Sequence, residues 1–302
     1  MSSPSQGTTA PAWWAVGDVT SAAIDFGASN TDVVFRSPDG LRHWTLPTEG
    51  QPDLSRVHRA LSAGDVTASQ CAWLAVTGGN RSALPPVIEG RPVHQVPEVE
   101  AIGRGGLALS GLEAAVVASA GSGTAVVRAT PDGMRHVTGT GVGGGTLVGL
   151  SRLLLDTVNP QEIDALARAG TDTTHNLTIG EILGQAIGSL PPDTTAVNFG
   201  RVARHAVNAP REDTAAALVN MVGQVIAIVA INAARAQQLE HAVIVGHLTD
   251  LPSVRHTFEM VAQFYGAAIR IPEQGGQATA LGALLSGAER FAAPPLTTGT
   301  GA

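Results

Sequence analysis

The sequence predicts an α/β protein made of two related lobes, because one strand-rich pattern occurs twice and helical segments follow it each time. In residues 22–46 an apolar strand breaks at a small polar turn, resumes, and passes through an Asp-Gly turn into a third strand. Residues 114–138 repeat this order of elements with little sequence identity. We expect an internal structural duplication, with ligands bound where strands end in the cleft between the lobes.

The two lobes are predicted at residues 18–112 and 113–290, with flexible tails at 1–17 and 291–302. The N-terminal tail is rich in serine, threonine, proline and alanine and lacks the basic start and apolar core of a secretory signal. Cys71 is the only cysteine, which excludes a disulfide framework within the chain. Together these features favour a cytoplasmic protein.

The elements of the first lobe are predicted from apolar runs and from the turns that bound them. A Pro-Asp-Gly turn at 38–40 separates the second and third strands. Leu54, Val57 and Leu61 recur at the spacing of one helix face. The expected strands are 19–27, 32–36, 42–46, 71–76 and 93–96, and the expected helices are 54–63 and 101–111.

The second lobe repeats the three-strand unit and continues mainly as helices. The expected strands are 114–119, 125–129, 134–138 and 241–246, and the expected helices are 145–155, 161–169, 179–187, 198–207, 214–239 and 278–288. Residues 214–239 are too apolar all round for a surface helix, so we expect them in the core or in a subunit interface. No uninterrupted apolar run is long enough to span a membrane, and no membrane partner is expected.

The charged residues exclude several kinds of partner and mechanism. The net charge is −7 and there is no basic cluster, so nucleic acid is not an expected partner. All 18 basic residues are arginine. A chain without lysine has no P-loop lysine, no strand lysine of a protein kinase and no Schiff-base amine. The nine histidines show no metal-ligand spacing, so a zinc site is not expected.

The densest candidate site is the glycine-rich segment 138–150. Five glycines lead into a helix-like run, and glycine lets backbone amides approach a ligand closely. A helix N-terminus adds a field that favours anions, so this pattern indicates nucleotide or phosphate binding. The alternative is a flexible loop. The segment is not a dinucleotide fingerprint, because it does not follow the first strand and no acid follows it at the required distance.

Two small-residue turns occupy matching places in the repeated units, at 25–31 in the first lobe and at 121–124 in the second. If they face each other across the cleft, their backbone amides clamp phosphates from both sides without a lysine. The alternative is a pair of ordinary hairpin turns, which favour the same residue types.

Glu98 and Glu100 directly follow a strand and a proline. In an extended chain they share a face, where one serves as a general base and the other as its structural partner. The alternative is two exposed loop acids. Arg135 and His136 precede the glycine-rich segment and are either ligand contacts or ordinary surface residues.

The order of these motifs resembles that of the type II (eukaryote-like) pantothenate kinases, members of the acetate and sugar kinase, actin-like superfamily. The resemblance runs through residues 20–288. The matching segments are Asp25-x-Gly27, 77–80, Glu98-x-Glu100, 121–123, 137–146 with Gly149-Leu150, 193–200 and 276–284.

The resemblance implies two ribonuclease H-like lobes of the actin and sugar-kinase type with a cleft between them. It implies ATP-dependent phosphorylation of a primary alcohol, pantothenate or a pantothenate-like molecule, with ATP and Mg²⁺ as cofactors and a homodimer as the assembly. Glu98 would be the general base on the substrate hydroxyl, and Asp25 the Mg²⁺ ligand. The implied nucleotide-binding residues are Asp25, Gly27, Ala28, Ser29, Asn30, Gly121, Gly123, Thr140, Gly141, Gly143, Gly144 and Gly145. The implied substrate-binding positions are Glu98, Ser122, Ala125, Arg135 and His136.

The chain departs from the family pattern at this site. The first turn of the family reads Asp-x-Gly-Gly-Thr-x-x-Lys, and here Ala28, Ser29 and Asp32 stand at the second glycine, the threonine and the lysine. Ala125 takes the place of a substrate-contacting serine. His136 takes the place of an arginine, whose planar fork suits bidentate contact.

These departures put pantothenate itself in question, although Arg135 is adjacent to His136 and could substitute for the arginine. They leave two other readings open. One is a superfamily ATPase of the hydantoinase or activase type, whose first turn has an aspartate where Asp32 stands. The other is a catalytically weakened dimeric homologue that binds a ligand or a partner.

Overall fold

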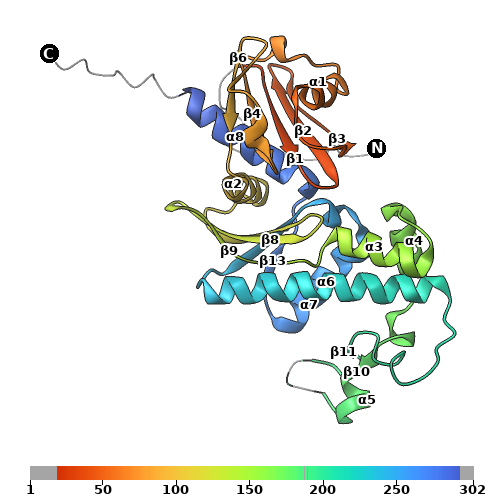
Figure 1. Ribbon diagram of the computed structural model, residues 1–302. Helices are drawn as coiled ribbons and strands as arrows, with labels where there is room; N and C mark the ends of the chain where they lie inside the picture. Colours follow the sequence, from red (N-terminus) through yellow and green to blue (C-terminus); the bar gives the residue numbers. More distant parts are fainter. Residues whose placement is uncertain (1–18, 187, 189, 293–302) are drawn as a thin grey trace, which may run out of the picture.

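The computed structural model describes residues 19–292 except 187 and 189, and it contains two α/β lobes joined by two helices (Figure 1). The predicted tail at 1–17, and the part of the predicted tail at 291–302 that follows residue 292, lie outside the described residues.

The first lobe is built on a six-stranded sheet in the order β3-β2-β1-β4-β6-β5. Its strands are β1 (Ser21–Phe26), β2 (Asn30–Ser37), β3 (Gly40–Pro47), β4 (Trp73–Gly78), β5 (Val87–Ile88) and β6 (Arg91–Gln95). β1, β2 and β3 form two antiparallel hairpins, in which Asp25 lies opposite Asp32. β4 and β6 continue the sheet parallel to β1.

The second lobe repeats this plan. Its five-stranded sheet has the order β13-β12-β7-β8-β9, with β7, β8 and β9 antiparallel and with β12 and β13 parallel to β7. The strands are β7 (Ala115–Ala120), β8 (Thr124–Thr130), β9 (Gly133–Thr140), β12 (His241–Val245) and β13 (Ala268–Arg270). Both sheets place three antiparallel strands beside strands parallel to the first one, so the predicted structural duplication is confirmed.

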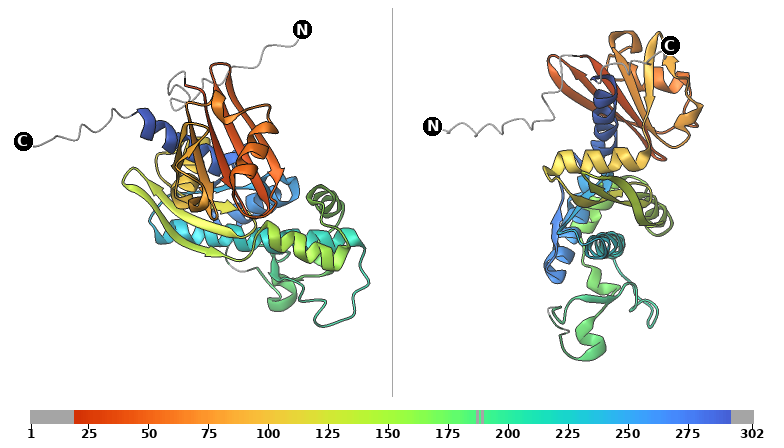
Figure 2. Two further views of the ribbon diagram at one scale, coloured as in Figure 1. Left: turned by 45° about the horizontal axis from the view of Figure 1, so that its top comes forward. Right: turned by 90° about the vertical axis from the view of Figure 1, so that its left-hand side faces the viewer.

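Helices α2 (Glu98–Ser110) and α8 (Ala278–Ala292) lie between the two sheets (Figures 1 and 2). α2 packs on the second sheet, with Ile102 in its core. α8 returns to the first sheet, where Leu281 packs with Ala75. The last helix, which was predicted within the second lobe, thus contributes its apolar face to the core of the first lobe, while its first residue, Ala278, packs with the second sheet.

The backbones of α2 and α8 touch where the helices cross. A Cβ atom at Gly105 would lie 1.8 Å from the carbonyl oxygen of Ala278, and one at Gly282 would lie 1.8 Å from that of Ala101. No side chain fits at such a distance, so both positions need glycine for the helices to approach this closely.

Four helices form the layer on the other face of the second sheet. They are α3 (Gly144–Leu155), α4 (Pro160–Ala169), α6 (Arg211–Ala236) and α7 (Pro252–Tyr265). One side of α6 is buried against β7 and β12, which confirms the core position predicted for this apolar segment. By length and composition α6 could also cross a membrane, but a buried core helix of a globular protein meets the same criterion.

Helix α1 (Leu54–Ser62) covers the outer face of the first sheet through Val57 and Leu61, as its spacing predicts, whereas Leu54, the third residue of the predicted apolar face, is exposed. Asp53 caps it by accepting a hydrogen bond from the Arg56 amide at 2.8 Å. Short 3₁₀ turns complete the connections: η2 (Ala68–Gln70), η3 (Arg81–Ala83), η4 (Asp172–Thr174), η5 (His247–Asp250) and η6 (Gly275–Gln277).

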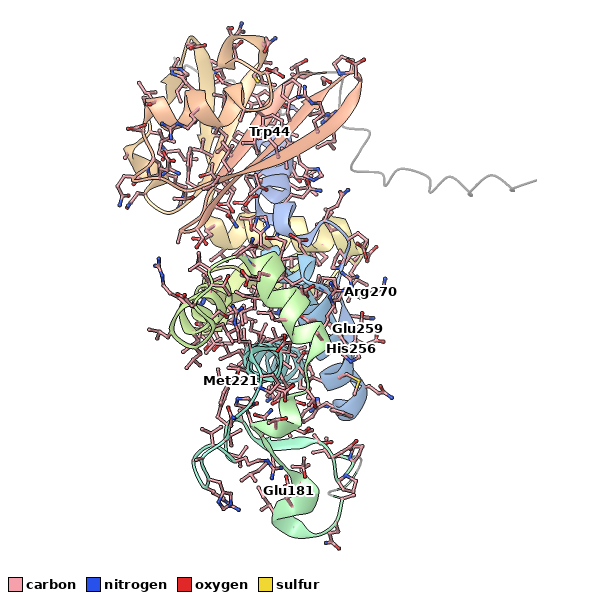
Figure 3. All side chains as sticks on the ribbon, turned by 90° about the vertical axis from the view of Figure 1, so that its right-hand side faces the viewer. Trp44, Glu181, Met221, His256, Glu259 and Arg270 are labelled. Carbon is pink, nitrogen blue, oxygen red and sulfur yellow. The ribbon has the colours of Figure 1, made fainter. Side chains whose placement is uncertain are left out.

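A segment between α4 and α6 projects from the second lobe below α6 in Figure 1, and Glu181 marks its far end in Figure 3. It contains β10 (Leu177–Thr178), α5 (Ile179–Leu183) and β11 (Thr195–Val197). The helix predicted at 179–187 is thus limited to one short turn of α5, which ends before a glycine in the left-handed conformation.

The helix predicted at 198–207 does not form. Phe199 adopts a left-handed backbone conformation, and its amide donates a hydrogen bond to the side chain of Asn176 at 2.9 Å. Both features remove this residue from a helical ladder, so the segment consists of turns until α6 begins.

Candidate active site

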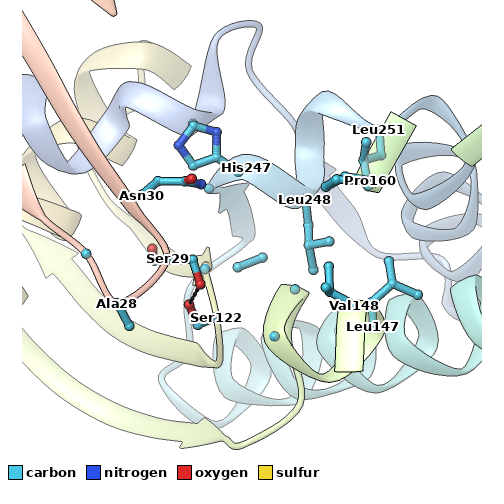
Figure 4. A pocket seen from close by; sticks show the side chains of 18 of the residues that line it. Ala28, Ser29, Asn30, Ser122, Leu147, Val148, Pro160, His247, Leu248 and Leu251 are labelled. Carbon is cyan, nitrogen blue, oxygen red and sulfur yellow. Dashed lines mark hydrogen bonds between the residues drawn. The ribbon is translucent and has the colours of Figure 1, made fainter. Parts of the chain in front are cut away.

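Two small-residue turns face each other where the lobes meet. The first, residues 27–29, joins β1 to β2, and the second, residues 121–123, joins β7 to β8. The hydroxyl oxygens of Ser29 and Ser122 lie 2.7 Å apart and form a hydrogen bond between the lobes (Figure 4). The duplicated fold explains the pairing, because the same turn leaves the first hairpin of each lobe. The predicted meeting of the two turns is confirmed.

The turns line a cleft of about 480 Å³. Figure 4 shows Asn30, His247 and the two serines on one side of the cleft and apolar side chains on the other. The labelled apolar side chains are Leu147, Val148, Pro160, Leu248 and Leu251. Asp25 and Asp32, which pair across β1 and β2 next to the first turn, also line the cleft. A polar end joined to an apolar end suits a ligand that carries phosphates on an apolar ring system.

The two turns offer unpaired backbone donors. The amides of Ala28, Ser29, Gly121 and Ser122 donate no hydrogen bond to any other residue that the structure describes, and all four residues line the cleft. Amides that converge without protein acceptors form an anion site, so this arrangement fits the phosphates of a nucleotide.

The glycine-rich segment packs against the second turn and forms hydrogen bonds with its backbone. Gly143 packs so closely on it that a Cβ atom would lie 2.6 Å from the carbonyl oxygen of Ser122. The amides of Gly144 and Gly145 donate to the carbonyl oxygens of Gly121 and Ser122 at 2.7 and 2.9 Å. These two amides are therefore engaged with the protein, although both glycines line the cleft at the start of α3.

The structure brings together most of the predicted nucleotide-binding residues. Those that line the cleft are Asp25, Gly27, Ala28, Ser29, Asn30, Gly121, Gly144 and Gly145. Those that do not are Gly123, Thr140, Gly141 and Gly143. The second group lies behind the turn, where the Val142 amide donates to Thr140 Oγ1 at 3.1 Å.

Asp25 lies at the end of β1, beside the first turn, in an acidic environment. Burial, together with repulsion from Asp32 and Glu98, raises the pKa of its carboxyl group to about 8, while His247 acts in the opposite direction. A bound divalent cation would relieve the same repulsion. No cluster of three acidic, histidine or cysteine side chains occurs among residues 19–292 as described, so Mg²⁺ would be held by Asp25 together with phosphate oxygens.

His247, at the start of η5, is a cleft residue that sequence reasoning missed. Its Nε2 lies 2.9 and 3.0 Å from the two carboxylate oxygens of Asp32, and its Nδ1 lies 3.1 Å from Asp250 Oδ2. Burial lowers the pKa of His247, but the hydrogen bonds to Asp250 and Asp32 outweigh this effect and raise the pKa to about 10. The acid at position 32 is therefore paired with a cation from the other lobe. The only signal in the sequence was a polar residue directly after a buried strand.

Glu98 and Glu100 lie in the first turn of α2. The prediction that they share a face of an extended chain is wrong, because residues two apart in a helix point in different directions. Glu100 accepts hydrogen bonds from Arg104 Nε and Ser286 Oγ at 2.9 and 2.8 Å, which ties α2 to α8. Glu98 is exposed and does not line the cleft, and its side chain makes no hydrogen bond with another described residue, but its charge acts on Asp25.

The predicted substrate-binding residues of the second sheet divide between its two faces. Ala125 packs on the α2 face, and His136 shares this face with Met134 because the two are two residues apart in β9. Arg135 lies on the opposite face, where its guanidinium group donates to Gln237 Oε1 at 2.8 Å near the end of α6. Arg135 is therefore held away from α2 and does not replace an arginine at position 136.

The fold and the cleft define the class of protein: it has the fold of the acetate and sugar kinase, actin-like superfamily. The structure is similar to the activator of 2-hydroxyisocaproyl-CoA dehydratase from Clostridium difficile, solved with bound ADPNP, with a TM-score of 0.63 and 15% identity over 90% of this chain and 95% of that one. It is similar to component A of (R)-2-hydroxyglutaryl-CoA dehydratase from Acidaminococcus fermentans, with a TM-score of 0.63 and 15% identity over 91% and 100%. At these identities the likeness concerns the fold, and it confirms the predicted fold class.

Within this class, the chain belongs to the Fumble family, whose model matches residues 115–286. It is 29% identical to the type II pantothenate kinase of Oceanobacillus iheyensis over 270 residues, which make up 87% of this chain and 98% of the relative. It is 28% identical to the type II pantothenate kinase of Bacillus cereus over 171 residues, and this match covers 56% of this chain and 63% of the length of the relative. The resemblance to type II pantothenate kinases is confirmed.

Proposed function

We propose that this protein is an ATP-dependent kinase that phosphorylates a primary alcohol, pantothenate or a pantothenate-like molecule, with Mg²⁺ as its metal. The observation that carries the proposal is the pair of turns with unpaired amides, which meet at the 2.7 Å contact between Ser29 and Ser122. Asp25 lies beside the first turn, and the charge of Glu98 acts on it. Homology to type II pantothenate kinases supports the same activity.

Each group has a task in this transfer. The amides of the two turns bind phosphate oxygens and place the terminal phosphorus in line with the acceptor. Glu98 takes the proton from the acceptor hydroxyl, whose oxygen bonds to the γ-phosphorus while the bond from this phosphorus to the β–γ bridging oxygen breaks. The products are the phosphorylated alcohol and ADP. Asp25 would hold Mg²⁺, which would supply neutralisation of the phosphate charge.

Transfer of labelled γ-phosphate to pantothenate, pantetheine and a panel of hydroxylated metabolites tests the proposal. Glu98→Gln should lower kcat by at least about 100-fold, as expected for loss of a general base, while Mg-ATP binding measured by calorimetry stays unchanged. Glu113→Gln is the matched control, because Glu113 is an exposed acid like Glu98 but its charge does not act on Asp25. Unchanged turnover in Glu98→Gln would exclude Glu98 as the base.

The proposal includes a cytoplasmic homodimer that binds neither nucleic acid nor a membrane. The side of α6 that the second sheet does not cover is only partly buried, and it would supply the subunit interface. Light scattering over a range of protein concentrations tests the assembly. A monomer at every concentration would contradict it.

A superfamily ATPase without an alcohol acceptor is the second candidate. It is favoured by the composition of the α2 face of the second sheet. Ala125 offers no hydroxyl group on this face, and Arg135 is held on the opposite face. ATP hydrolysis that no added alcohol changes would support this candidate, and phosphate transfer to an alcohol would contradict it. A folded protein that binds no Mg-ATP would instead indicate a catalytically weakened homologue.

A further inference from the structure

We propose that His247 lowers the negative charge that the terminal phosphates of the nucleotide meet in this lysine-free chain, because its imidazolium ring neutralises one of the two carboxylates, Asp32 and Asp250, that hold it in place. The inference rests on the proposed function, because it assigns a residue of the same nucleotide site. His247 belongs to the second lobe, across the cleft from the first turn, and it lies in none of the motif segments that resemble the family.

The charges of the cleft create the need for such a residue. Asp25 and Asp32 place two carboxyl groups on its polar side, where a polyphosphate would add more negative charge. The chain contains no lysine. Among the described residues that line the cleft, only His247 and Arg152 are basic. Even with Mg²⁺ held at Asp25, a carboxylate that stays uncompensated beside the turns, such as Asp32, would repel the phosphates.

The position of the two basic residues decides between them. Arg152 lies eight residues after Gly144 on α3, which places it about 12 Å along the helix from the turns at 1.5 Å per residue. His247 instead pairs directly with Asp32 of β2, and it lies on the same side of the cleft as Asn30 and the two serines in Figure 4. His247 is therefore the basic group at the phosphate end.

The hydrogen bonds of the ring show that it is charged. Both ring nitrogens lie within 3.1 Å of carboxylate oxygens, Nε2 at Asp32 and Nδ1 at Asp250. A neutral imidazole has one donor, and only the imidazolium form can donate from both nitrogens. Thr45 Oγ1 on β3 also donates to Asp32 Oδ1 at 2.6 Å, so this carboxylate has a second partner besides the histidine.

The ring is also open to the cleft. A third of the His247 side chain is exposed, so phosphate oxygens can approach it while its two carboxylate contacts stay intact. The imidazolium then acts through its charge and cancels one of the two flanking carboxylates. Removing it would leave both Asp32 and Asp250 uncompensated beside the phosphates.

Binding of Mg-ATP and of adenosine, measured by calorimetry and by ligand-detected NMR, separates this role from a structural one. His247→Gln should weaken Mg-ATP binding at least tenfold and change adenosine binding less than twofold, because adenosine carries no phosphate. His247→Arg should keep most of the affinity for Mg-ATP. The double variant His247→Gln/Asp32→Asn should recover much of the loss, because it removes an anion together with the cation.

His43→Gln is the matched control, since His43 is exposed on β3 outside the cleft. Equal losses of Mg-ATP and adenosine binding in His247→Gln would overturn the inference, and so would unchanged Mg-ATP binding. If the wild type binds Mg-ATP through His247 but phosphorylates no alcohol, the proposed kinase function fails while the inference holds. A wild type that binds no nucleotide overturns both.

Discussion

Ser29 and Ser122 are 93 positions apart in the chain, and the hydrogen bond between their hydroxyl groups joins the phosphate turns of the two lobes. The pair formed by Asp32 and His247 joins the lobes along the same cleft. Each lobe thus provides half of the polar wall, and neither half is complete alone. The contacts across the cleft are therefore the part of the site most open to direct tests.

The serine contact predicts a small and shared effect on stability. Ser29→Ala and Ser122→Ala should each lower the free energy of unfolding by about 1 kcal/mol or less, because the bond is exposed and joins two neutral hydroxyl groups. The double variant should cost no more than either single variant, since either substitution removes the same bond. Urea unfolding measures all three. Losses that add in the double variant would show that the two serines act independently.

Asp25 predicts that the free protein loses stability as the pH rises from about 4 to about 8. Its pKa rises from 3.8 to about 8 in the folded state, so between these values the folded carboxyl group holds a proton that the unfolded one releases. The resulting stabilisation is complete below pH 3.8, falls as the pH rises, and is lost above about 8. Asp25→Asn should therefore flatten the decline of the melting temperature between about pH 4 and pH 8 without Mg²⁺. Asp39→Asn, in an exposed turn, is the control, and parallel curves for wild type and Asp25→Asn would contradict the prediction.

The close crossing of α2 and α8 predicts that a single methyl group added at the crossing point strongly lowers the free energy of unfolding. Gly105→Ala should lower the free energy of unfolding by about 2 kcal/mol or more, because its Cβ atom would overlap the carbonyl oxygen of Ala278. Gly149→Ala is the control in another helix, where no atom lies within 4 Å of the added carbon. That variant should be neutral or gain up to about 1 kcal/mol, since alanine favours a helix. Equal effects of the two substitutions in denaturant unfolding would argue against the tight crossing.

The two faces of β9 predict opposite results for neighbouring residues. Arg135→Ala should leave the KM for the alcohol acceptor within twofold of the wild type, because the side chain is bound to Gln237 on the face away from α2. His136→Ala should change this KM, since His136 shares the α2 face with Ala125. Steady-state kinetics at saturating Mg-ATP measures both. An effect confined to Arg135→Ala would reverse the assignment of the faces.

The hairpin units and their turns could be predicted because their signals are local. An apolar run, a small turn and an Asp-Gly turn fix two antiparallel pairings within about 25 residues, and both units formed as expected. The extended conformation predicted for Glu98 and Glu100 was wrong, and this prediction too rested on a local signal. Pro97 follows a strand, yet it serves as the N-cap of α2, and the two glutamates enter a helix one turn earlier than expected.

The parts that could not be predicted depend on contacts between distant segments. Asp32 looked like an uncompensated acid, because its partner His247 is 215 positions away and belongs to the other lobe. The turning of Arg135 toward α6 depends on Gln237, which is 102 positions away. The glycines of the segment 138–150 predicted nucleotide or phosphate binding, with a flexible loop as the alternative, and only the packing on Ser122 shows that Gly143 serves a tight contact within the protein.

Helix α8 has a consequence for how a cell makes this protein. The sheet of the first lobe leaves the ribosome early, but Leu281, Leu284 and the alanines around them, which cover one of its faces, are synthesised last. Domains commonly fold in the order of their synthesis, and this lobe cannot do so. The apolar face under α8 stays uncovered while the second lobe is translated, so the first lobe can complete its core only after α8 has been made.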